Sequence, residues 1–270
     1  MSKKLLSAPY LFWSVMFILI PLGMVFYYGF TDKTGAFTLD NIIAITTAEH
    51  SKALWEALKL SFISTLICFL LAYPLALILS SRNVKQNSFL ILIFILPMWM
   101  NFLLRTLAWQ TLLEKTGVIN SILKFLNLPT LNIINKPEAI VLGMVYNFLP
   151  FMVLPLYNVL VKIDKNVINA ARDLGANSVQ TFFKIIFPLS LPGVFSGITM
   201  VFVPALTTFV ISNILGGSKI LLIGNVIEQE FTQTGNWHLG SGLSIVLMVF
   251  IIINMVISAL TDKDGEAQGL

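Results

Sequence analysis

The sequence is poor in charged side chains. Of its 270 residues, 11% are Asp, Glu, Lys or Arg and 57% are hydrophobic. A soluble domain usually carries about 25% charged residues, so this chain could not cover its surface with solvated groups. The shortage excludes a soluble globular enzyme and a disordered protein, and the net charge of +4 is too small for binding along nucleic-acid phosphates. A protein that crosses the membrane several times remains.

Cysteine and histidine are also scarce. The single cysteine, Cys68, excludes an intramolecular disulfide and lies in an apolar run, where we expect a small buried hydrophobe. The two histidines, His50 and His238, have no partner at the spacing of metal ligands. We therefore expect neither a metal site nor a cofactor.

Long apolar runs are what the sequence does contain, and a bilayer span needs about 20 such residues. Six runs qualify: 11–28, 58–79, 89–112, 139–161, 193–215 and 241–260. The first resembles a signal peptide, but its length and the lack of an Ala-x-Ala-like cleavage site favour an uncleaved span. We predict an all-α integral membrane protein with six transmembrane helices, forming one domain over 1–262, and a polar, disordered tail over 263–270.

The loops and charges suggest an orientation. An even number of spans puts both termini on one side, and a cytoplasmic N-terminus leaves slightly more basic residues inside than outside. The polar segment 31–56 then lies outside. The segment 114–138 mixes apolar and polar residues in a way that predicts a short interfacial helix on the outer face.

The segment 164–188, between the fourth and fifth runs, begins with a pattern typical of a short surface helix. Asp164 or Asn166 can cap its start, and Gly175 lies where a left-handed C-terminal residue is expected. Its apolar residues recur at helical spacing on one face, namely Val167, Ala170, Ala171 and Leu174.

A second short helix is expected after the glycine. Asn177 and Gln180 have the spacing of a capping box, and Pro188 and Pro192 are expected to end this helix and begin the fifth span. The pattern predicts a helix-glycine-helix elbow on the membrane surface, although a simple connecting loop would also satisfy it.

Residues 169–175 followed by 185–188 resemble the motif E-A-A-x3-G-x9-I-x-L-P of ABC-importer permeases. Asn169 stands where the motif has Glu, and Phe187 where it has Leu. In that family the elbow is the coupling helix, which docks into a groove of the cytoplasmic ATPase. The resemblance implies six ATPase-coupling residues: Asn169, Ala170, Ala171, Arg172, Asp173 and Gly175.

Further segments are similar to the polyamine branch of these permeases, which serves spermidine/putrescine importers. They are 104–113 with Gly117 and Asn120, 148–157, and 215–217. The resemblance implies an ABC type I importer in the bacterial cytoplasmic membrane. Its other parts would be an extracytoplasmic polyamine-binding protein, a second, C-type permease and a dimer of an ATP-binding subunit.

The sequence has no G-x-x-x-x-G-K-[ST] phosphate loop. Active transport would therefore need ATP hydrolysis by another chain, and we expect this chain not to be an enzyme. A stand-alone secondary transporter would instead require buried acids and an internal repeat, neither of which is visible. An intramembrane protease would require a buried Ser–His pair, and none can be placed. A permease for another small solute stays open as an alternative.

Polar and aromatic side chains in the apolar runs are candidates for the substrate path, since aromatic faces attract polycations. They are Trp99, Asn101, Arg105, Trp109, Tyr146, Asn147 and Thr207. Each aromatic residue could equally serve in packing or in an interfacial belt. Arg105 is the only charge well inside a run, but it is near the outer end, where it can snorkel to the interface.

Three further features bear on cation attraction, on the substrate path and on helix packing. Glu228 and Glu230, before the sixth run, could attract a cation or dock the binding protein. Pro204 with Thr207 and Thr208 could break the fifth span, which is tolerated where the break lines a cavity. A G-x-x-x-G pair at Gly193 and Gly197 predicts tight helix packing.

Overall fold

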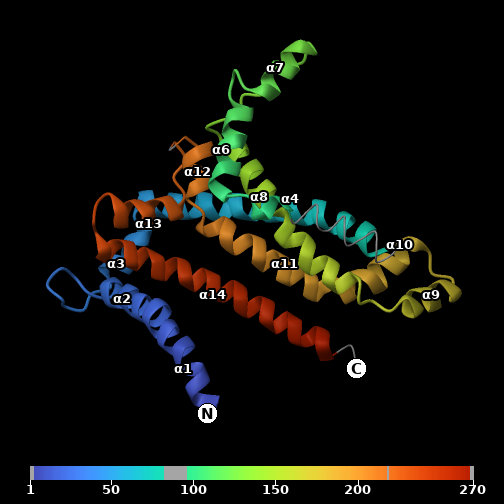
Figure 1. Cartoon of the computed structure of the whole chain (residues 1–270), viewed down its shortest axis with the longest axis horizontal. Coiled ribbons are helices and arrows are strands. Elements are labelled where there is room, and N and C mark those ends of the chain that lie inside the picture. The colour runs from blue at the N-terminus through green and yellow to red at the C-terminus, as the bar shows by residue number, and fades with distance from the viewer. Residues whose placement is uncertain (1–2, 82–95, 218, 268–270) are drawn as a thin grey trace.

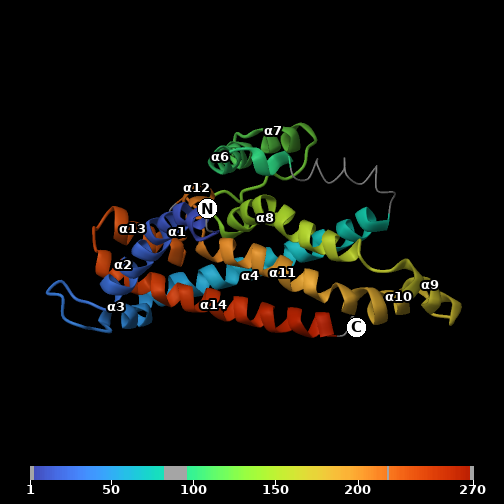
Figure 2. The same cartoon turned by 60° about the horizontal axis from the view of Figure 1, so that its bottom comes forward.

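The computed structural model describes residues 3–81, 96–217 and 219–267. Within these ranges the chain is helical and has no β-strand. Figure 1 shows α4, α8, α11 and α14 running alongside one another, while α6 and α7 stand away from them. The elbow of α9 and α10 lies at one end of this bundle, and α3 and α13 lie at the other, as Figure 2 also shows.

Five helical segments in the described ranges are long and apolar enough to cross a membrane. They are Pro9–Gly29, Ala48–Ser81, Pro137–Leu160, Ser178–Thr207 and Trp237–Ala259. They confirm five of the six predicted spans. The predicted third span, 89–112, lies partly outside the described residues, and its described part consists of η3 (Leu96–Trp99) and α6 (Phe102–Leu113). A sixth span therefore stays a prediction.

The first span is built from three pieces and is mostly exposed. They are α1 (Lys3–Ser14), a π-helical turn η1 (Val15–Leu19) and α2 (Ile20–Gly29). Side chains from other elements hold its C-terminal end: Asn41 Nδ2 donates to the carbonyl of Thr31 at 2.9 Å, and His238 Nδ1 lies 2.6 Å from the same oxygen. Since a carbonyl only accepts, Nδ1 of His238 carries the proton. Asn41 Nδ2 also lies 3.3 Å from the carbonyl of Gly29, the last residue of α2, which a helix end leaves unpaired.

The centre of the bundle is the contact of α4 (Ala48–Ser81), α8 (Pro137–Leu160) and α11 (Phe187–Thr207). A Cβ built on Gly193 would lie 3.0 Å from the backbone oxygen of Pro155, and one on Gly197 would lie 2.6 Å from Sδ of Met152. These two glycines let α11 approach α8 closely, which confirms the packing predicted from their spacing.

The fifth span begins earlier than predicted. The helix is continuous from α10 (Ser178–Thr181) through a π-helical turn η4 (Phe182–Ile186) into α11, so Pro188 does not end a helix. Pro188 lies in the first turn of α11, and the wider π turn before it accommodates a residue that has no N–H.

The predicted break of the fifth span is confirmed. Thr208 is extended, with ψ of 137°, and the chain resumes as α12 (Val210–Leu215). The side chain of Asn225, in α13 (Ile223–Thr232), donates to the freed carbonyl of Phe209 at 3.1 Å and accepts from Ser212 Oγ at 2.6 Å. The irregular backbone is therefore covered by protein, as membrane depth requires.

Two further predictions concern the segment 114–138 and the C-terminal tail. A short helix in 114–138 is confirmed as α7 (Val118–Phe125); its place at a membrane interface stays a prediction. The disordered tail is wrong for 263–267, because α14 (Trp237–Ala267) remains helical past the apolar run. Helical hydrogen bonds are internal to the segment, so a polar continuation does not end them. Short elements α3 (Asp40–Ile43) and η2 (Ala44–Thr46) connect the first span to α4.

Candidate functional site: the elbow and the cleft between three helices

The elbow has the local geometry that its sequence predicts. Oδ1 of Asp164 accepts from the N–H of Asn166 at 2.8 Å, which caps α9 (Lys165–Asp173). Gly175 has φ of +87°, and the N–H of Ala176 bonds to the carbonyl of Ala171 at 3.0 Å. Together with the bond from the N–H of Gly175 to the carbonyl of Arg172, at 2.9 Å, this is the Schellman arrangement that ends a helix at glycine.

The second half of the elbow is capped as expected. Asn177 Oδ1 accepts from the N–H of Gln180 at 2.8 Å, and Gln180 Oε1 accepts from the N–H of Asn177 at 3.0 Å. This reciprocal capping box fixes the start of α10. The elbow is therefore an ordered unit rather than an irregular loop.

Most of the predicted coupling residues are exposed on the elbow. Asn169, Ala170, Arg172, Asp173 and Gly175 are exposed, whereas Ala171 is buried. Arg172 and Asp173 form no ion pair with any described residue. Ala171 packs against the rest of this chain and is therefore not available to a partner protein. The predicted apolar face is thus divided between the interior and the surface.

Large apolar side chains are exposed on both halves of the elbow; Leu174 belongs to the predicted apolar face, whereas Val179 and Phe183 were not predicted. Leu174 is 89% exposed, and Val179 and Phe183 are each 64% exposed. Large apolar side chains grouped on a surface mark contact sites more often than single ones do.

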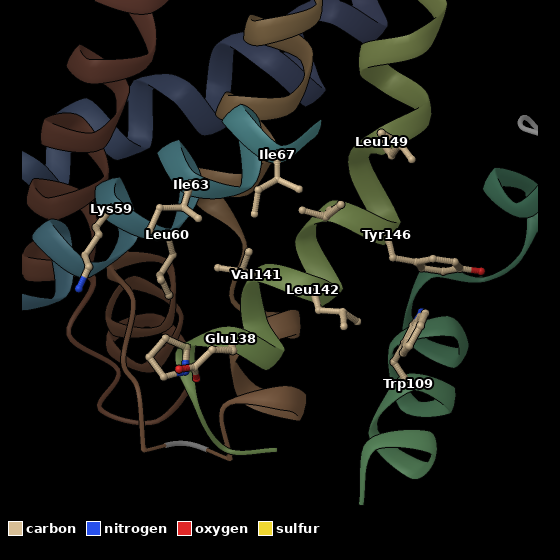
Figure 3. Close-up of a pocket in the computed structure, with 12 residues that line it drawn as sticks. Lys59, Leu60, Ile63, Ile67, Trp109, Glu138, Val141, Leu142, Tyr146 and Leu149 are labelled. Carbon is tan, nitrogen blue, oxygen red and sulfur yellow. The ribbon is translucent and has the colours of Figure 1, made fainter. Parts of the chain in front are cut away.

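A second feature is a cleft of about 810 Å³ between α4, α6 and α8. Figure 3 shows Trp109 of α6 facing Tyr146 of α8 on one side, and Lys59 and Glu138 at the other end. The wall between them is apolar and includes Val141 and residues of α4.

The cleft brings together two of the predicted path residues. The rings of Trp109 and Tyr146 meet edge to face, with centroids 5.2 Å apart and an interplanar angle of 68°. Both line the cleft. The negative faces of two adjacent rings can attract a cation.

The other predicted path residues lie elsewhere. Trp99 is 80% exposed. Asn101 caps α6, accepting from the N–H of Leu103 at 2.9 Å. Asn147 is buried, and its Nδ2 donates to the carbonyl of Gly143 at 2.8 Å. Neither asparagine lines the cleft, because each side chain is engaged with its own helix.

Thr207 lies in another cavity, of about 410 Å³, which is also lined by Glu228. Its hydroxyl donates to the carbonyl of Val203 at 3.1 Å. The sequence-predicted path residues therefore do not form a single site, although Thr207 does lie at the break in the fifth span.

Arg105 does not snorkel to an interface as expected. It is only 7% exposed, and its Nε and Nη1 have no hydrogen-bond partner among the described residues. Its position on the packed side of α6, rather than its distance from the end of the run, decides its burial.

Glu138 and Lys59 were missed as lining residues. Glu138 was placed in an outer loop, but it lies in the first turn of α8, directly after Pro137. Proline followed by an acid is a signal for a helix start, where the helix dipole favours a negative charge. Lys59 Nζ lies 4.0 Å from Oε2 of Glu56, one turn away on α4.

Comparison with known families identifies the kind of protein. Residues 4–263 match the family described as "binding-protein-dependent transport system inner membrane component". The chain belongs to this family. It is a multi-pass permease subunit of an ABC transport system, which also comprises ATP-binding and substrate-binding components, and it is not itself an enzyme.

Curated relatives cover nearly the whole chain. The spermidine/putrescine transport system permease protein PotB of Haemophilus influenzae is 36% identical over 260 residues, which cover 93% of this chain and 91% of the relative. The protein of the same name from Escherichia coli K12 is 36% identical over 268 residues, covering 95% and 98%.

Solved structures share the fold. A chain of a bacterial alginate ABC transporter, in complex with its alginate-bound periplasmic protein, superposes with a TM-score of 0.77 at 16% identity, covering 94% of this chain and 91% of that one. A chain of the MetNI methionine ABC transporter gives 0.58 at 17% identity, covering 80% and 95%. The fold is thus that of ABC importer permeases.

Proposed function

We propose that this chain forms half of the translocation path of an ATP-driven importer for spermidine and putrescine. The assignment of the substrate rests on the 36% identity, over more than nine-tenths of both chains, to permeases named for these two polyamines. The complete importer would contain a second, C-type permease, a dimer of an ATP-binding subunit and an extracytoplasmic polyamine-binding protein.

The elbow is the proposed contact with the ATP-binding subunit. Its support is the exposure of Asn169, Ala170 and Asp173 together with the unpartnered apolar side chain of Leu174. Ala171 and Gly175 set the shape of the elbow, and Arg172 offers a charge beside the contact. The rigid capping at both ends of the segment suits an element that transmits a movement.

The elbow also supports an orientation. If it faces the ATP-binding subunit, its end of the bundle is cytoplasmic. Helix α14 runs from the opposite end, near α13, toward the elbow end, and α2 ends beside α3 (Figure 1). Both termini would then be cytoplasmic, in the bacterial inner membrane.

The proposed substrate path includes the cleft at Trp109 and Tyr146. A cation over an aromatic ring gains about 0.5–2 kcal/mol, more when water is excluded. Thr207, at the break of the fifth span, is a second proposed path position. The four remaining path candidates would act only through the shape of the path. Asn101, Arg105 and Asn147 are buried or hydrogen-bonded to their own helix, and Trp99 lies on the surface.

Reconstitution tests this function directly. The full complex, with ATP inside proteoliposomes, should accumulate labelled spermidine and putrescine when the binding protein is outside. This chain alone should show no ATP-dependent uptake. Accumulation of neither polyamine by an ATP-hydrolysing complex would overturn the substrate, and robust uptake by the single chain would overturn the subunit role.

A further inference from the structure

The cleft between α4, α6 and α8 has different chemistry at its two ends. We infer that it binds an extended polyamine, with one terminal ammonium at the carboxylate of Glu138 and the other at the rings of Trp109 and Tyr146. The cleft would thereby select a polyamine by the distance between its terminal ammonium groups. This inference rests on the proposed function.

One face of α8 forms a continuous side of the cleft. Glu138, Val141, Val145 and Tyr146 all line it, and their spacing puts them on the same helical face. Figure 3 shows α8 rising from Glu138 past Leu142 to Tyr146, whose ring faces Trp109 of α6. Eight residues of helix separate Glu138 from Tyr146, a rise of about 12 Å at about 1.5 Å per residue.

That rise can be compared with the length of a polyamine. A fully extended chain advances about 3.6 Å for every three bonds, or about 1.2 Å per bond. Nine bonds separate the terminal nitrogens of spermidine, which corresponds to about 11 Å, whereas five bonds separate those of putrescine, about 6 Å. Spermidine can therefore reach both ends of the cleft at once, and putrescine can occupy only one.

The chemistry between the two ends agrees with an alkyl chain. Apolar side chains such as Val141 and Val145 line this stretch and can cover methylene groups without leaving a polar group unpaired. Glu138 is the only acid among the described residues that line the cleft. The middle amine of spermidine is protonated at neutral pH and finds no acid partner in this stretch, so it must face the open, hydrated side of the cleft. The compound 1,8-diaminooctane, which also has nine bonds between its nitrogens but no middle amine, should bind at least as well.

Lys59 opposes the ammonium at the Glu138 end. Its charge is partly countered by Glu56, 4.0 Å away, but it still disfavours a cation at the mouth of the cleft. Neutralising Glu138 and neutralising Lys59 should therefore change polyamine affinity in opposite directions. A merely structural role for the two residues does not predict opposite signs.

The test measures uptake by the reconstituted full complex with its binding protein, comparing each variant with wild type so that the binding protein's own preference cancels. Glu138→Gln should raise the half-saturating spermidine concentration about fivefold, since a hydrogen bond to a charge is lost at an exposed position. The half-inhibitory concentration of 1,8-diaminooctane should rise by the same factor, and that of putrescine by much less. Lys59→Gln should lower the spermidine value.

Glu114→Gln is the matched control, because Glu114 is an exposed acid outside the cleft; it should leave all three values unchanged. An unchanged spermidine value in Glu138→Gln, or equal effects on spermidine and putrescine, would overturn the inference while leaving the proposed function intact. So would loss of the second permease on purification of Glu138→Gln, which would make the cleft an interface between subunits. A wild-type complex that carries no polyamine would overturn the proposed function instead.

Discussion

Replacing Gly175 by valine isolates the contribution of one backbone conformation to coupling. Gly175 has φ of +87°, and no atom lies within 4 Å of the position that a Cβ would occupy. A side chain there meets no steric obstacle outside its own backbone. The effect of Gly175→Val must therefore come from the left-handed conformation itself.

The magnitude follows from that conformation. An L-residue in the left-handed region costs about 1–2 kcal/mol, and a β-branched side chain is at the upper end because its rotamers are restricted. The elbow can relieve this strain by giving up the bonds from Gly175 to Arg172 and from Ala176 to Ala171, which reorients α9 relative to α10. If the ATP-binding subunit docks on the native angle, its association should weaken about tenfold, the equivalent of about 1.4 kcal/mol.

The assay is co-purification of the ATP-binding subunit with the variant permease, together with substrate-stimulated ATP hydrolysis. Gly175→Asn should behave nearly as wild type, since asparagine tolerates the left-handed region. Gly235 has φ of +64° and equally open surroundings, but it precedes α14 at the other end of the bundle. Gly235→Val therefore carries similar strain and should leave association unchanged.

Two results would refute this reasoning. If Gly175→Val retains wild-type association and stimulation, the elbow is a connecting loop and its family resemblance is misleading. If Gly235→Val weakens association as much, the loss reflects general destabilisation rather than the geometry of the elbow.

Four further predictions concern separate parts of the molecule. Trp109→Ala should lower polyamine uptake by the complex without lowering co-purification of the ATP-binding subunit; normal uptake would return Trp109 to a packing role. Arg105→Met should not lower the thermal unfolding midpoint of the isolated chain, because two guanidinium nitrogens lack a partner among the described residues and an unpaired buried charge is costly; a lower midpoint would show that the group is paired. Gly193→Ile should destabilise by about 1–3 kcal/mol through overpacking against α8, measured against Gly23→Ile, where a Cβ meets nothing within 4 Å; equal midpoints would contradict it. The hydroxyl of Thr34, followed by the N–H of Ala36, holds the pKa of Asp32 below its ordinary value of 3.8. The loop that contains Asp32 should thus be stabilised above pH 3.8 and loosen as pH falls through the lower folded-state pKa. The measurement is the hydrogen-exchange protection factor of the loop, which should fall with pH in wild type and be low at every pH in Asp32→Asn.

The sequence by itself determined the features that depend on composition or on a few adjacent residues. A span requires only enough consecutive apolar residues, since the bilayer is its solvent. The elbow was predictable because its bonds join near neighbours, as in the capping box of Asn177 and Gln180 and the left-handed Gly175. The break at Thr208 was likewise foreseen from the local run of proline and threonines.

The start of the fifth span was not predictable from the same local signals. Pro188 usually ends a helix, but a π turn at Phe182–Ile186 absorbs it. Aromatic packing accompanies that turn: Phe182 contacts Tyr73 of α4 with ring centroids 5.6 Å apart. A contact with a residue over a hundred positions away cannot be inferred from a helix-breaking rule.

Only the tertiary structure decided which side chains meet. Trp109 and Tyr146 were chosen with five other residues by type alone, and the packing of α6 near α8 separated these two from the rest. Arg105 is buried because its side of α6 faces the protein. Glu138 reaches the cleft because α8 begins at Pro137, two residues before the predicted start at 139. Hydropathy specifies that a helix crosses the membrane but leaves its rotation and its neighbours undetermined, because apolar side chains cover most of its circumference; those are set by the close packing of small residues between helices.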